Sequence, residues 1–239
     1  MKTKSLWGKA PSRIYAFVRR YGDCIADGGV GVIGCSDGKF VFPFLRAGIR
    51  VCGFEIDSTA LRGGEKVFPE RGRAVNVGPY VKMVEKPVVV PCKSQSVYCQ
   101  GLLHRLEQEK LTDLFTLQEK DFFHTETAQR FSAVVTSCSI QYKCNRDLSL
   151  AQAVGKLQRV VKKGGYLLMD YMMPLEDCHQ WKASVFARTG QMRKLFGKGW
   201  TIIYNVERKK PVFEAAHVDR PEDHFHRFGY ILAQKRNDI

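Results

Sequence analysis

A short apolar run that ends in a glycine-containing turn is the feature that most limits how this chain can fold. Residues 29–33 read Gly-Val-Gly-Val-Ile, and residues 34–38 follow as Gly-Cys-Ser-Asp-Gly. An apolar run of this length is typical of a buried parallel strand, which helices cover on both faces. Glycines let a turn adopt backbone conformations that other residues resist. The segment therefore predicts the first strand and the first turn of an α/β sheet.

A helix, a second strand and an acid are expected directly behind this turn. Residues 40–47 carry apolar side chains at helical spacing, and residues 49–57 form a second apolar run that includes Glu55. The gap of 17 residues between Gly38 and Glu55 (55 − 38) leaves room for one helix and one strand. This order predicts half of a nucleotide-binding fold, in which the acid accepts hydrogen bonds from ribose hydroxyls. Taken alone, the turn is equally typical of an ordinary strand-to-helix connection.

The rest of the chain continues the alternation of helices and strands. Strands are expected at residues 114–117, 131–137 and 166–171, and helices at residues 11–21, 100–110, 148–162 and 190–196. Ser12 is expected to cap the first helix, and Gly164 and Gly165 are expected to end the helix at residues 148–162. Residues 200–206 and 226–235 are expected to pair as antiparallel strands.

These elements predict one domain that spans residues 1–239. Its fold class is α/β: a Rossmann-like, mostly parallel seven-stranded sheet flanked by helices, with an antiparallel strand at the C-terminal edge. An irregular insert is expected around residues 62–113, where the helical and strand patterns loosen.

The chain is strongly basic. Its 38 lysines and arginines oppose 24 aspartates and glutamates, which gives a formal net charge of +14. Such a charge favours anionic partners, of which RNA, a small anionic substrate and an acidic protein are the alternatives. No apolar run reaches the length of about 18 residues that a membrane helix needs, and the first residues do not resemble a signal peptide. We therefore expect a soluble, cytoplasmic protein with no membrane partner.

Eight cysteines raise the question of a metal site or a disulfide framework. None of them forms a Cys-x-x-Cys pair, and several lie in predicted strands, where a thiol packs as a small apolar group. We therefore expect reduced thiols and no bound metal. A zinc site that joins Cys92, Cys99 and His104 is the alternative.

Several segments resemble the class I S-adenosylmethionine-dependent methyltransferases, most closely the tellurite-resistance (TehB-like) and thiopurine-type branch. Residues 34–38 are similar to the Gly-x-Gly-x-Gly turn of these enzymes, and residues 51–55 are similar to their second strand and its acid. Further similar segments are the N-terminal segment at residues 6–12, a Lys-Pro-Gly-Gly-Tyr-like turn within residues 157–166, and the closing hairpin within residues 199–235. Two residues depart from the family: Val32 replaces its usual acid and Ser36 its central glycine.

The resemblance implies an S-adenosyl-L-methionine cofactor at the carboxyl edge of the sheet. Glu55 is expected to hold the ribose, and Asp121, which closes the third strand, the exocyclic amine of the adenine. Asp121 is equally suited to cap a helix. The cofactor-binding residues expected from the resemblance and from the ends of the strands are Gly34, Cys35, Ser36, Gly38, Glu55, Ile56, Asp121, Phe122 and Ser137.

The expected reaction is methyl transfer to a small-molecule acceptor by in-line displacement, in which alignment of the reacting atoms matters most. A nucleophile that starts protonated also needs a base. The expected catalytic residues are His217 and Asp170, with Glu214, His224 and His226 as further candidates. His217 is equally typical of a surface loop.

The expected substrate contacts are Trp7, Tyr142 and Arg227, although each aromatic side chain is equally suited to a core. Two alternative functions stay open. One is an RNA methyltransferase that uses the basic surface, and the other is a non-catalytic binding protein with the same fold. The sequence leaves the oligomeric state undetermined.

Overall fold

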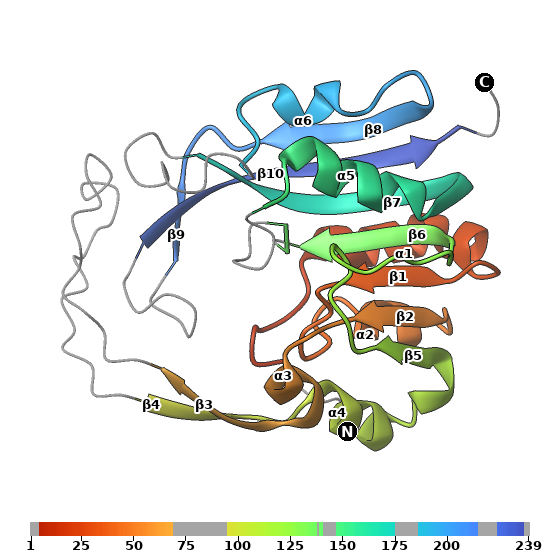
Figure 1. Cartoon of the computed structure of the whole chain (residues 1–239). Helices are drawn as coiled ribbons and strands as arrows, with labels where there is room; N and C mark the ends of the chain where they lie inside the picture. Colours follow the sequence, from red (N-terminus) through yellow and green to blue (C-terminus); the bar gives the residue numbers. More distant parts are fainter. Residues whose placement is uncertain are drawn as a thin grey trace.

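A computed structural model describes residues 5–68, 95–137, 139–140, 147–174, 186–214 and 224–236. Its main sheet has seven strands in the order β5-β2-β1-β6-β7-β10-β8, and a short strand, β9, pairs with one end of β10 (Figure 1). The bounds are β1 Val30–Ile33, β2 Val51–Phe54, β5 Phe115–Gln118, β6 Phe131–Ser137, β7 Val161–Met173, β8 Trp200–Glu207, β9 Val212–Glu214 and β10 His224–Lys235.

The five strands from β5 to β7 run parallel, and β10 is antiparallel to both of its neighbours, β7 and β8. The expected fold class is therefore confirmed, with β10 inserted one position inside the edge. All four residues of β1 are buried, because β1 lies in the middle of the sheet between β2 and β6. A strand covered on both faces requires an apolar run, which is what the sequence shows.

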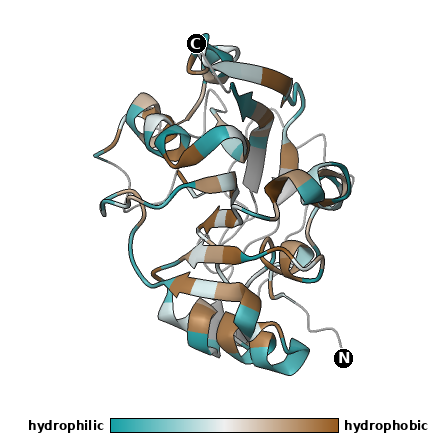
Figure 2. Cartoon of the chain, turned by 90° about the vertical axis from the view of Figure 1, so that its right-hand side faces the viewer, coloured by the Kyte–Doolittle hydropathy of each residue, from teal (hydrophilic) through white to brown (hydrophobic). Residues whose placement is uncertain are grey.

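Two hydrophobic cores lie on the two faces of the sheet. One contains apolar residues of α1 Ser12–Ile25, α2 Phe42–Leu45 and α4 Leu102–Glu109. The other contains apolar residues of α5 Leu150–Arg159 and α6 Gln191–Lys194. Figure 2 shows apolar colouring on the central strands and mixed colouring on the helices, as expected for helices with one buried face.

Two predicted helix ends are wrong. Ser12 is the first residue of α1, and the capping position belongs to Pro11, whose side chain has no group that could accept a hydrogen bond from the helix. The helix expected at residues 148–162 is α5. It begins with a capping box between Ser149 and Gln152 but ends at Arg159, before Gly164 and Gly165. Val161 already pairs with Phe131 as part of β7, so Gly164 lies in the bulge of that strand, at φ 74°.

The region expected as an irregular insert is more regular where the structure describes it. Its described part contains an antiparallel ribbon of β3 Gly64–Phe68 and β4 Gln95–Cys99, followed by α4, and it is flanked by α3 Ser58–Arg62 and the 3-10 turn Thr112–Leu114. Residues 69–94 lie outside the described part. Among the described helices, none combines the length and the apolar character that a membrane crossing requires.

Candidate functional site at the carboxyl ends of the strands

The carboxyl ends of the parallel strands share one edge of the sheet, toward which the arrowhead of β6 points in Figure 1. The β3–β4 ribbon and β9 extend on this same side. In open α/β sheets, ligands bind in the crevice outside this edge. The turn behind β1, the acid behind β2 and the loop behind β5 all lie here, so the topology brings the predicted site residues to one edge.

The glycine turn behind β1 has a left-handed backbone at three positions: Gly34 at φ 68°, Ser36 at φ 48° and Gly38 at φ 95°. A side chain at Gly34 would also stand 2.9 Å from Cβ of Ser139, which is too close. Ser36 is the residue that departs from the glycine of the family, and it adopts the glycine-like conformation nevertheless. Its hydroxyl accepts a hydrogen bond of 3.0 Å from Nε1 of Trp7.

Asp37 fastens the turn to two distant segments. Its carboxylate accepts hydrogen bonds from Oγ of Ser5 at 2.6 Å and from N of Leu6 at 2.5 Å. On the other side lies Arg105 of α4, whose Nη1 donates to the carbonyl of Asp37 and stands 3.6 Å from its carboxylate. Both side chains are almost fully buried, and burial lowers the pKa of Arg105 against the opposing effect of Asp37.

Glu55 joins the end of β2 to the glycine turn. Its Oε2 accepts a hydrogen bond of 2.7 Å from N of Ser36, and its Oε1 accepts from N of Ile56 at 2.8 Å and N of Asp57 at 2.9 Å. The next side chain, Ile56, is 54% exposed, although it is large and apolar. An anchored carboxylate beside an exposed apolar side chain could hold a sugar hydroxyl and the face of a ring.

Asp121 lies behind β5 in a cluster that the sequence did not predict. Its Oδ1 accepts from N of Phe123 at 2.9 Å, and its Oδ2 stands 3.0 Å from Nδ1 of His124. The other ring nitrogen of His124 stands 3.1 Å from the carboxylate of Asp147. The hydrogen bonds to Asp121 and then to Asp147 raise the pKa of His124. The side chain of Phe122 is buried among core aromatics, against Phe54 and Phe123, rather than at the surface of the site.

Asp170 and Ser137, both predicted as site residues, are in direct contact. Oγ of Ser137 donates to Oδ2 of Asp170 at 2.8 Å, and Arg13 of α1 forms an ion pair with the same carboxylate. The guanidinium of Arg13 also stacks 4.3 Å from the ring centre of Tyr230. Burial raises the pKa of Asp170, and Arg13 opposes that shift. Because its oxygens are already engaged, the geometry favours an anchoring role for Asp170.

The other predicted residues are spread more widely. Cys35 is buried, and burial, followed by the charge of Glu55, raises the pKa of its thiol well above the usual range. Arg227 also lies at the carboxyl edge, where it donates to the carbonyl of Arg208 at 2.8 Å and to Oγ1 of Thr189 at 3.1 Å. The remaining predictions lie outside the described residues or side chains: His217, Tyr142, Glu214, His224 and His226.

The described residues contain no group of three or more His, Cys, Asp or Glu side chains that could hold a metal ion. Of the proposed zinc ligands, Cys99 is buried as a reduced thiol, and Nε2 of His104 contacts Gln108 at 2.8 Å. Cys92 lies outside the described residues. The described cysteines, Cys24, Cys35, Cys52 and Cys99, lie outside disulfide bonds.

Sequence reasoning missed three cations that fix the site: Arg13, Arg105 and His124. Arg13 is separated from Asp170 by 157 residues, and Arg105 from Asp37 by 68 residues. Local patterns carry no signal for such pairs. His124 is closer to a detectable signal, because it follows Asp121 by three residues.

The fold resembles that of several solved structures. TehB from Haemophilus influenzae has a TM-score of 0.59 and 11% identity over 95% of this chain and 62% of its own. Magnesium protoporphyrin IX methyltransferase (ChlM) from Synechocystis PCC 6803, solved with bound SAH, has a TM-score of 0.55 and 12% identity over 94% of this chain and 80% of its own. For N-methyltransferase NodS from Bradyrhizobium japonicum WM9, the TM-score is 0.52 and the identity 13%, over 94% of this chain and 95% of its own.

The likeness confirms the fold that the sequence resemblance implied, that of the class I methyltransferases. The chain spans less than two thirds of the length of TehB. No protein-family model matches the sequence, and no curated protein matches it.

Proposed function

We propose that this chain, which has the fold of the class I methyltransferases, is an S-adenosyl-L-methionine-dependent methyltransferase that acts on a small-molecule acceptor. One observation carries the proposal: Glu55, at the end of β2, is hydrogen-bonded to the left-handed glycine turn behind β1. This is the junction where a nucleotide-binding fold holds a ribose. Related structures support the choice of cofactor, since ChlM and the glycopeptide N-methyltransferase MtfA were each solved with SAM.

The residues present fit such a cofactor. Three backbone N–H groups hold the Glu55 carboxylate in one orientation, which leaves one of the roughly four acceptor positions of a carboxylate, on Oε2, for a ribose hydroxyl. Ile56 offers an apolar surface for one face of the adenine, and Asp121 an acceptor for its exocyclic amine.

The cofactor supplies an electrophilic methyl group on a sulfonium, so the protein has mainly to position the reactants. Asp37, Arg105 and Trp7 hold the turn, while Arg13 and Asp170 hold Ser137 at the end of β6. His217 is the proposed base, on the family resemblance alone. Trp7 and Arg227 are the proposed acceptor contacts within the described residues.

A non-catalytic binding protein is the second candidate, and Val32 favours it. Val32 is buried in the middle of β1, where the family usually has an acid that helps to orient the turn and the methionine ammonium. In this chain Glu55 contacts the turn directly, and Ser36 receives the hydrogen bond from Trp7. These contacts support the turn in place of the acid that the family has at the position of Val32. Neither contact places a carboxylate at that position, where it would face the methionine ammonium.

Calorimetry with S-adenosyl-L-methionine and its demethylated product tests the proposal. Glu55→Ala should weaken binding by about 1.5–3 kcal/mol, the range for hydrogen bonds to a charged group, which is about 10-fold to 100-fold in affinity. Glu107→Ala, an exposed site on α4 with the same change of charge, is the matched control and should bind normally. No heat from the wild-type chain with either compound would contradict the proposal.

A further inference from the structure

The opposite edge of the sheet, where the parallel strands begin, gathers cations from segments far apart in the sequence. Five of these side chains are exposed, and Lys235 is half-buried. We call this set the basic belt: Arg50, Arg130, Lys162, Lys163, Lys235 and Arg236. Its members precede β2 and β6, open β7 and close β10, which runs antiparallel.

Contacts connect the first half of the belt along the edge. Nη2 of Arg50 donates to the carbonyl of Asp27, in the turn before β1, at 3.2 Å. Nζ of Lys162 and the hydroxyl of Ser132 both crowd the position that a Cβ would take at Gly28 in that same turn. The ammonium of Lys162 therefore lies across the starts of β1 and β6, beside the segment that Arg50 contacts.

The second half of the belt joins β7 and β10. Nζ of Lys235 donates to the carbonyls of Gln158 at 3.1 Å and Val161 at 2.9 Å, where it complements the C-terminal end of α5. Burial, followed by the positive charge of Arg130, lowers the pKa of Lys235, so these two cations are close. Nε of Arg236 donates to Oγ1 of Thr201 at 3.2 Å.

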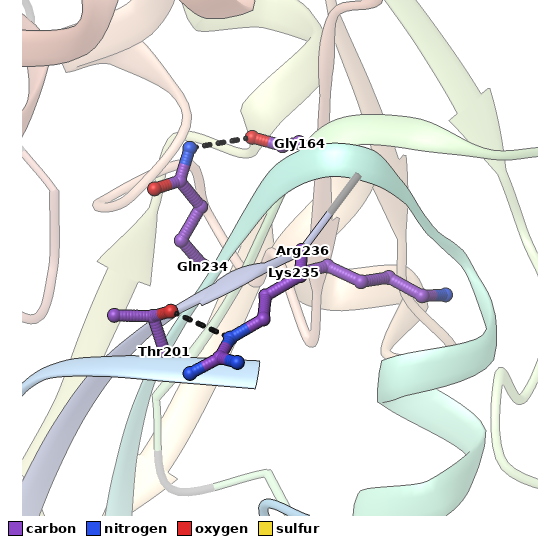
Figure 3. Close-up of a pocket in the computed structure, with 5 residues that line it drawn as sticks. All are labelled: Gly164, Thr201, Gln234, Lys235 and Arg236. Atoms are coloured by element: carbon purple, nitrogen blue, oxygen red, sulfur yellow. Dashed lines mark hydrogen bonds between the residues drawn. The ribbon is translucent and has the colours of Figure 1, made fainter. Parts of the chain in front are cut away.

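A hollow of about 250 Å³ lies in this half of the belt. Figure 3 shows Thr201 and Arg236 in contact, Gln234 bonded to the carbonyl of Gly164, and Lys235 pointing the other way. None of these five lining residues is acidic. Asp23, Asp27, Glu107 and Asp113 are exposed acids near the same edge, and they are fewer than the six cations of the belt.

We propose that the basic belt is a docking surface for the backbone of single-stranded nucleic acid. The belt extends over four inter-strand steps from β2 to β10, which is about 19 Å at the usual strand spacing, long enough for several phosphates. A membrane surface fits less well. The large apolar side chains that the described residues expose, Tyr15, Ile56, Tyr98 and Val206, do not belong to this edge.

The docking surface is independent of the proposed methyl transfer. The belt and the Glu55 site lie at opposite ends of the strands, and the seven residues of β6 span about 20 Å. Nucleotides bound to the belt itself are therefore held away from the candidate site. The belt would tether the protein to nucleic acid rather than present the methyl acceptor.

Fluorescence anisotropy with a labelled 15-nucleotide oligo(U) RNA tests the proposal. Each phosphate contact contributes about −0.7 to the slope of log affinity against log salt, so four to six contacts predict a slope of about −3 to −4. The wild-type chain should then lose affinity by about 100-fold between 50 and 200 mM salt. Arg130→Gln/Lys162→Gln/Arg236→Gln should bind more weakly, and its loss over the same range should fall to about 10-fold.

The matched control is Arg208→Gln/Lys209→Gln/Lys210→Gln, which removes three exposed cations at the other end of the strands. It should bind the RNA like the wild type, and both variants should keep the wild-type melting temperature and the wild-type response to S-adenosyl-L-methionine. Three outcomes would overturn the proposal: no RNA binding at 50 mM salt, equal losses in the two variants, or binding to phosphatidylserine vesicles that the belt variant loses while RNA binding persists. Loss of the cofactor response alone would instead count against the proposed function.

Discussion

The two edges of the sheet carry charged side chains of opposite sign, because opposite ends of the helices lie beside them. At the carboxyl edge, carboxylates gather where backbone N–H groups and helix N-termini are exposed: Glu55 accepts three N–H groups, and Asp57 caps α3. At the amino edge, helix C-termini present carbonyls, and cations gather there, as Lys235 does at the end of α5. Helices that return the chain between parallel strands all point the same way, so their dipoles favour this separation.

The edges also differ in how their charges are used. The acids of the carboxyl edge are engaged: Asp37 with Arg105, Asp170 with Arg13, and Asp121 with His124. Most cations of the basic belt, in contrast, face solvent. The engaged acids hold the candidate site in shape, whereas the solvent-facing cations form the surface that we propose contacts a phosphate backbone. Mutations that break the pairs should therefore affect stability more than mutations in the belt.

The largest expected effect comes from breaking the buried pair beneath the glycine turn. Asp37→Ala leaves the guanidinium of Arg105 buried without its carboxylate, which typically costs about 3–5 kcal/mol of unfolding free energy. Urea unfolding followed by circular dichroism measures the change. If this variant does not fold, Asp37→Asn keeps the shape of the side chain and should be destabilised less.

The control for this prediction is Glu119→Ala, which removes one partner of the exposed pair with Arg62. Little change in stability is expected there, because exposed pairs gain almost nothing over water. Equal losses of stability in the Asp37 and Glu119 variants would mean that the buried pair of Asp37 and Arg105 does not stabilise the carboxyl edge more than an exposed pair does.

The sequence predicts those features of the sheet and of the candidate site that depend on local patterns. Strands β1, β2 and β6 were predictable because burial on both faces demands unbroken apolar runs, and Glu55 because it ends such a run. The engaged partners were not predictable, since Arg13 reaches Asp170 only through the folding of the whole chain. The predicted end of α5 is wrong because β-sheet pairing of Val161 overrides the glycine signal that begins three residues later, at Gly164.

A smaller effect is expected from the pH dependence of the His124 cluster. Both ring nitrogens face carboxylates, Asp121 and Asp147, so the ring donates twice only when it is protonated. Lys156, which donates to the carbonyl of Phe123, is a further charge facing this loop. The pKa of His124 is raised in the folded state. Its contribution to stability is therefore complete below the usual value of about 6.5 and is lost as pH rises through the folded pKa.

The difference in unfolding free energy between the wild type and His124→Gln should accordingly be larger at pH 6 than at pH 9. His104→Gln is the matched control, since this exposed ring contacts Gln108 rather than a carboxylate, and its difference should not depend on pH in this way. An NMR titration should find the pKa of His124 above the usual histidine value of about 6.5. A value at or below it would show that Asp121 and Asp147 do not stabilise the charged ring.

The smallest expected effect concerns Ser36, the departure from the glycine turn of the family. Its left-handed backbone costs about 1 kcal/mol or more, which Ser36→Gly would relieve. The same substitution removes the acceptor for Nε1 of Trp7, a hydrogen bond that contributes about 0.5–1.5 kcal/mol. The two terms oppose each other, so the unfolding free energy should change little. Trp7→Phe removes this hydrogen bond together with part of the ring, so it should destabilise the wild type more than it destabilises Ser36→Gly, a difference that a double-mutant cycle by urea unfolding measures. Equal effects of Trp7→Phe in both backgrounds would show that Ser36 does not anchor the N-terminal segment, and would leave Asp37 alone to fasten it to the carboxyl edge.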